Sequence, residues 1–123
     1  MRGIINFVSL YWIAITAVLL TSITVLSLTP LEKLPTVPGS DKFHHLVAYA
    51  ALTIPLTLKK PKYWRLIVIF FLVYSGLIET IQPHVNRYGE WLDIAANSLG
   101  IALGFLFAKL FSYFVPVKFK LSN

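Results

Sequence analysis

The feature that most constrains this chain is an uncharged apolar run that extends from Ile4 to Leu28. As an α-helix this run would be about 37 Å long, which exceeds the roughly 30 Å of a bilayer's hydrocarbon core. It is longer than the apolar region of a signal peptide and ends without a small-x-small cleavage site, so the sequence predicts an uncleaved membrane helix. A mean hydropathy of +0.73 with 13% charged residues excludes a soluble domain of this size.

Three further apolar stretches have the length of a membrane span. Between them lie short polar segments, of which Thr29–Ser40 contains three prolines and a glycine and must be a loop. The four spans and their loops use the whole chain, so we expect one domain over residues 1–123. The predicted fold is all-α, a polytopic membrane four-helix bundle with spans at about 4–28, 42–58, 64–82 and 91–115.

The basic residues indicate topology. Those on one side of the predicted spans are Arg2, Lys59, Lys60, Lys62, Arg65, Lys109, Lys118 and Lys120, and those on the other side are Lys33, Lys42 and Arg87. By the positive-inside rule, both termini are cytoplasmic. The net charge of +6 then reflects this topology and attraction to anionic lipid, and we expect no nucleic-acid partner. The chain has no cysteine, which excludes disulfides, thiolate catalysis and Cys-ligated metals.

The start of the fourth span carries a polar stripe that cannot face lipid. At 100° per residue, Asp93, Asn97, Gly100 and Gly104 fall within an arc of about 60°. An ionised Asp at the hydrocarbon centre costs roughly 2.5–3.5 kcal/mol on insertion scales, so we expect other polar groups to converge on it. The two glycines form a small-x-x-x-small packing seam, which also permits a homo-oligomer.

Polar side chains from two other stretches fall at the same depth, one or two turns below the outer surface. Their spacing of three or four residues places them on one face of each predicted helix. The topology therefore predicts one outward-facing polar site. Its members from these stretches are Asp41, Lys42, His45 and Tyr49 on the second helix, Glu79 and Gln82 on the third, and Arg87 in the following loop.

These residues form three ordered motifs, which are D-K-x-x-H-x-x-x-Y from Asp41, G-x-x-E-x-x-Q from Gly76, and R-x-x-x-x-x-D-x-x-x-N-x-x-G-x-x-x-G from Arg87. Together they resemble the VanZ-like family of small polytopic membrane proteins, over residues 41–104. The family is named for an accessory factor that raises resistance to teicoplanin. The resemblance implies a membrane-helix fold, the bacterial cytoplasmic (inner) membrane and a cell-envelope context, but no defined reaction.

The leading interpretation is a pocket that binds an anionic lipid head group, a lipid-linked cell-wall precursor or a lipoglycopeptide. Arg87 and Lys42 would hold the anion, because a guanidinium binds phosphate or carboxylate groups bidentately. Glu79 and His45 would exchange protons or hydrogen bonds with the ligand. The other predicted binding residues are Asp41, Tyr49, Gln82, Asp93 and Asn97.

Two alternatives stay open on the sequence alone. The protein is either a membrane enzyme acting on lipid-linked substrates, with Glu79 or His45 as general base, or a structural partner whose polar groups only hold the helices together. In the structural alternative, Glu79 forms a buried pair with Arg87 or Lys42. A metal site is disfavoured, because the spacings H-x-x-x-H, H-E-x-x-H and D-D-x-x-D are absent, and no cofactor is predicted.

Overall fold

The computed structural model describes residues 2–30, 41–85 and 91–114, and all the regular structure in these ranges is helical. This confirms the predicted all-α class. The helices are α1 (Arg2–Leu10), α2 (Trp12–Ser27), α3 (Asp41–Lys59), α4 (Trp64–Ile81), the 3₁₀ helix η2 (Gln82–Val85) and α5 (Trp91–Phe114).

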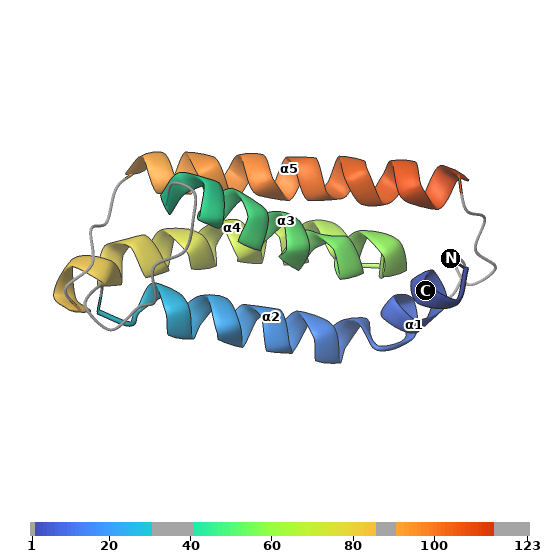
Figure 1. Cartoon of the computed structure of the whole chain (residues 1–123), viewed down its shortest axis with the longest axis horizontal. Coiled ribbons are helices and arrows are strands. Elements are labelled where there is room, and N and C mark those ends of the chain that lie inside the picture. Colours follow the sequence, from blue (N-terminus) through green and yellow to red (C-terminus); the bar gives the residue numbers. More distant parts are fainter. Residues whose placement is uncertain (1, 31–40, 86–90, 115–123) are drawn as a thin grey trace.

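The four long helices run alternately in opposite directions along the molecule (Figure 1). α3 and α5 begin at one end, where α2 and η2 finish. We call this the cluster end, because buried polar side chains of α3, α4 and α5 lie together there. α1 lies at the opposite end, together with the finish of α3 and α5 and the start of α4. The three stretches that were predicted to supply polar side chains at one depth therefore do share one end of the molecule.

Two helical segments of the described chain are long and apolar enough to cross a membrane. They are Trp64–Val85, which comprises α4 and η2, and Trp91–Phe114, which is α5. α1 and α2 pass the same test together and give a third crossing if the bent pair is one span. α2, α4 and α5 carry large exposed apolar side chains, as contact with lipid requires. These include Ile13, Val18, Val25, Leu66, Phe70, Val73, Leu99, Leu106 and Leu110.

The predicted first span over residues 4–28 is wrong as a single helix. α1 and α2 are bent by 75° relative to each other, and the break lies at Tyr11, whose φ of −105° and ψ of 27° leave the α-helical region. No proline or glycine marks this position. The break instead follows from packing, because α1 turns aside to contact α3, where Ile5 and Ser9 become buried.

The predicted span over residues 42–58 corresponds to α3, which is not among the described helices that are apolar enough to cross by composition. Its first half carries Lys42, His44 and His45. α3 contacts α1, α2, α4 and α5, and its side chains Tyr49 and Thr53 are almost fully buried. A helix enclosed by protein tolerates polar groups that a lipid-facing helix does not. The four-span topology stays a prediction.

The closest helix pair is α3 with α5, and two glycines determine how closely these helices approach. A Cβ atom at Gly100 would overlap the carbonyl oxygen of Leu46, and one at Gly104 would overlap the carbonyl oxygen of Ala50. Both glycines are buried, as are Asp93 and Asn97 on the same stripe. The prediction that this stripe cannot face lipid is therefore confirmed: the stripe faces α3.

Candidate functional site

Four polar side chains from three helices meet inside the cluster end. His45 comes from the second turn of α3, Glu79 from the last turn of α4, and Asp93 and Asn97 from the first two turns of α5. Their exposed fractions are 9% for His45, 6% for Glu79 and 1% for each of the other two. We call these residues the buried cluster. Burial of ionisable groups costs free energy, and in the membrane-spanning part of a protein such groups generally mark a functional site.

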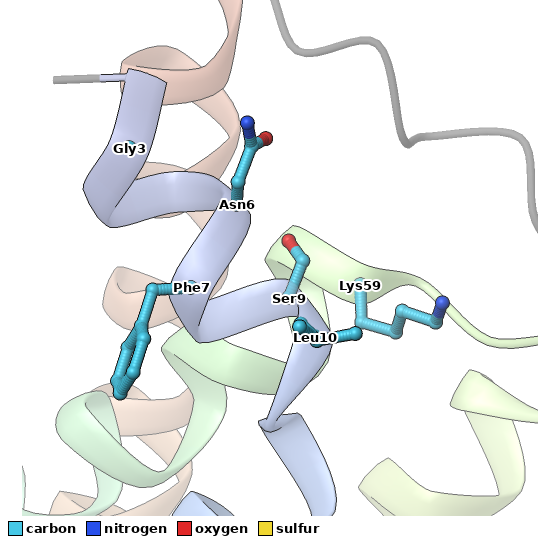
Figure 2. A pocket seen from close by; sticks show the side chains of 6 residues that line it. All are labelled: Gly3, Asn6, Phe7, Ser9, Leu10 and Lys59. Atoms are coloured by element: carbon cyan, nitrogen blue, oxygen red, sulfur yellow. The ribbon is translucent and has the colours of Figure 1, made fainter.

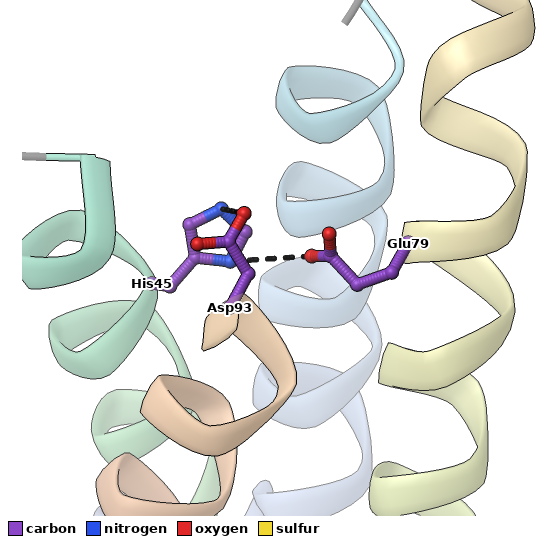
Figure 3. A group of neighbouring side chains, drawn as sticks. All are labelled: His45, Glu79 and Asp93. Carbon is purple, nitrogen blue, oxygen red and sulfur yellow. Dashed lines mark ion pairs between the residues drawn. The ribbon is translucent and has the colours of Figure 1, made fainter. Parts of the chain in front are cut away.

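The His45 imidazole lies close to both carboxylates of the buried cluster (Figure 3). Its Nδ1 is 3.8 Å from Oε1 of Glu79, and its Nε2 is 4.0 Å from Oδ2 of Asp93. Nδ1 is also 3.0 Å from Oδ1 of Asn97, within hydrogen-bonding distance. With Asn97 accepting from Nδ1–H, the neutral ring presents the lone pair of Nε2 on the side of Asp93.

Lys42 connects the buried cluster to the surface. Its Nζ is 3.6 Å from Oδ1 of Asp93, and 42% of its side chain is exposed while that of Asp93 is almost fully enclosed. The lysine lies one turn before His45 on α3, so both project toward the start of α5. A cation at this position lowers the electrostatic cost of the buried carboxylates and is accessible from outside the protein.

Two of the predicted binding residues take part in the packing of the helices. Tyr49 is 2% exposed and belongs to the apolar core, one turn deeper than His45. Gln82 donates a hydrogen bond from Nε2 to the backbone oxygen of Ser27 at 3.0 Å, and so fastens the end of α4 to the end of α2. Arg87 and the side chain of Asp41 lie outside the described residues.

The chemistry of the buried cluster combines acid–base and ligand groups. An imidazole close to two carboxylates can accept and release protons. His45, Glu79 and Asp93 also each offer one metal-ligand atom, and these three atoms lie within 4.8 Å of one another. Sequence spacing could not reveal this donor set, because each residue comes from a different helix.

A second polar feature lies at the opposite end of the molecule. A pocket of about 290 Å³ is lined by α1 and the end of α3, and Asn6, Ser9 and Lys59 supply its polar side chains (Figure 2). The other described basic side chains of this end, Lys60, Lys62, Arg65 and Lys109, each lie over an aromatic ring. None of the described residues at this end is a carboxylate, so the acid–base groups belong to the cluster end alone among the described residues.

Comparison with known proteins supports the family resemblance. Residues 2–112 match the VanZ/LLP1 family model, which covers nearly the whole chain. The match confirms the resemblance that was based on the motifs between Asp41 and Gly104. No curated protein and no solved structure matches the chain.

Proposed function

The chain belongs to the VanZ/LLP1 family, and we propose that this membrane protein binds the anionic head group of a lipid or lipid-linked precursor at its cluster end. The observation that carries the proposal is a half-exposed lysine directly above a buried cluster of histidine and carboxylates. Lys42 is the attractive group for a phosphate, and His45 with Glu79 is the pair that exchanges hydrogen bonds or protons with it.

The proposal includes an orientation, with the cluster end facing outward across the bacterial cytoplasmic membrane. Its support is the distribution of charge among the described residues. Lys59, Lys60, Lys62, Arg65 and Lys109 all lie at the end opposite to the buried cluster, as the positive-inside rule requires of a cytoplasmic end. In this orientation the ligand is a head group in the outer leaflet, in keeping with a cell-envelope role.

The direct test measures retention of a fluorescent polyprenyl phosphate by the purified protein in nanodiscs of phosphatidylcholine. We expect Lys42→Gln to weaken retention about tenfold or more, which corresponds to about 1.4 kcal/mol of lost attraction. Lys62→Gln is the matched control, because it removes the same charge from the opposite end, where Lys62 lies over Tyr63. Equal retention by the wild type and both variants would refute the proposal.

Two competing ligands extend this test. Phosphatidylglycerol competes if any anionic head group fits, and the lipoglycopeptide teicoplanin competes if the site takes the antibiotic itself. Competition by phosphatidylglycerol alone supports a general lipid site. Competition by teicoplanin that Lys42→Gln abolishes would assign the antibiotic as a ligand and connect this chain to the resistance after which the family is named.

A catalytic role for the same site is the second candidate, and the position of His45 favours it. Its Nδ1 lies 3.8 Å from the Glu79 carboxylate and its Nε2 lies 4.0 Å from that of Asp93, so each ring nitrogen of a potential general base has a carboxylate nearby. Turnover of the labelled lipid in the retention experiment separates the two functions. A binding protein retains the lipid unchanged. An enzyme converts it to a product, and Glu79→Gln abolishes the formation of that product.

A further inference from the structure

We propose that His45, Glu79 and Asp93 together bind one divalent transition-metal ion, of the Zn²⁺ or Mn²⁺ type, within the cluster end. The three residues reach the same point from α3, α4 and α5, and one ligand atom from each lies within 4.8 Å of the other two. One imidazole nitrogen with carboxylate oxygens is a donor set suited to these ions. Metal binding is independent of the head-group proposal and is tested with the metal alone.

The three ligand atoms lie close enough together for small movements to complete a metal site. In a tetrahedral or octahedral site with bonds of 2.0–2.2 Å, neighbouring ligand atoms lie about 3.0–3.5 Å apart. One ligand atom from each of the three residues lies within 4.8 Å of the other two. Movements of about 1–2 Å would therefore close the three ligands around an ion.

Asn97 has the position of an outer partner that fixes the histidine. Metal-binding histidines generally donate their second ring N–H to an oxygen, which sets the tautomer and holds the ring. Nδ1 of His45 is 3.0 Å from Oδ1 of Asn97, and Asn97 is 1% exposed. This bond leaves Nε2 of His45 as the ligand atom, on the side where Asp93 lies.

Charge gives the second reason for an ion at this position. Two carboxylates, each at least nine-tenths buried, lie close to the same imidazole, and the partly exposed Lys42 lies beside Asp93. A divalent cation bound by both carboxylates would be held by their negative charge. It would also allow a phosphate to approach carboxylates that would otherwise repel it, because three protein ligands leave a coordination position open. In this way the ion would contribute to binding of the head group. Only this contribution rests on the proposed function.

The experiment is a metal-binding titration of the purified, metal-stripped protein in detergent micelles. Zn²⁺ affinity is measured by competition with a chromogenic chelator, and bound Mn²⁺ by electron paramagnetic resonance. We expect about one ion per chain, with affinity at least about tenfold weaker in His45→Gln, Glu79→Gln and Asp93→Asn. His84→Gln is the matched control, because His84 is an exposed histidine of η2 and its loss should leave binding unchanged.

Two outcomes overturn the proposal: a wild-type chain that binds neither ion, or binding that survives in His45→Gln and is lost in His84→Gln. Because a variant can fail to fold, two readouts keep the test decisive. The ion should raise the melting temperature of the wild type and His84→Gln but not that of Glu79→Gln. Co²⁺ in the wild type should give d–d absorption bands typical of nitrogen and oxygen ligands, and their absence would refute the site without any variant.

Discussion

The contact between α3 and α5 gives the sharpest prediction, since it can be worked from distances. A Cβ at Gly104 would lie 2.9 Å from Cα of Ala50, and one at Gly100 would lie 3.1 Å from the carbonyl carbon of Leu46. Carbon atoms in ordinary contact are about 3.5–4.0 Å apart, so Gly100→Ala or Gly104→Ala must separate the helices by about 0.5–1 Å. The obstructing atoms are backbone atoms and cannot rotate away.

The expected loss of stability has two opposing contributions. Overpacking of this kind costs about 1–3 kcal/mol. Alanine is a better helix former than glycine by about 1 kcal/mol, which offsets part of this cost. We therefore expect each substitution to lower the free energy of unfolding by up to about 2 kcal/mol, and the double variant to lose more than either alone.

Gly76→Ala is the matched control, because a Cβ at this helical glycine of α4 would meet nothing within 4 Å. It should leave stability unchanged or raise it by up to about 1 kcal/mol. The assay is thermal unfolding of each purified variant in the same detergent, followed by tryptophan fluorescence. If Gly100→Ala and Gly104→Ala melt at the temperature of Gly76→Ala, the close approach of α3 and α5 is wrong.

Two further predictions test other parts of the reasoning. Gln82→Met removes the hydrogen bond to the oxygen of Ser27 while keeping a similar volume, so it should lower the free energy of unfolding by about 1 kcal/mol. Lipid retention and metal binding should not change, and a loss of either would show that Gln82 takes part in the site. Because the chain has no cysteine, a single introduced cysteine reports the orientation in the membrane directly. When intact cells are treated with a membrane-impermeant maleimide, His84→Cys should be labelled and Lys62→Cys should be protected. The reverse pattern would invert the proposed topology.

The sequence was sufficient to predict the buried cluster because membrane helices leave little freedom to polar groups. Helical spacing alone placed Asp93 and Asn97 on the stripe of Gly100 and Gly104, and the cost of charge in lipid required that stripe to face protein. Alternating helix directions then put His45 and Glu79 at the same end. Each step depends on a strong local rule, and the structure brings these residues together accordingly.

The details that escaped prediction are set by tertiary contacts without a local signal. Tyr11 interrupts the first apolar run although neither proline nor glycine is present, because α1 packs on α3. Gln82 shares a helix face with Glu79 in sequence, yet its amide points to Ser27 of α2. The ligand atoms of His45, Glu79 and Asp93 come from three helices, so they match no metal-binding motif that is read along the chain.

The close packing of α3 on α5 also bears on oligomerisation. The small-x-x-x-small seam permits a homo-oligomer when it is exposed. In this chain Gly100 and Gly104 are both buried against the backbone of α3, so a dimer through this seam would require α5 to leave its partner. Such a movement would also separate Asp93 and Asn97 from His45 and dismantle the buried cluster. The geometry therefore favours use of the seam within one chain, where it holds α3 and α5 in the register that the cluster needs.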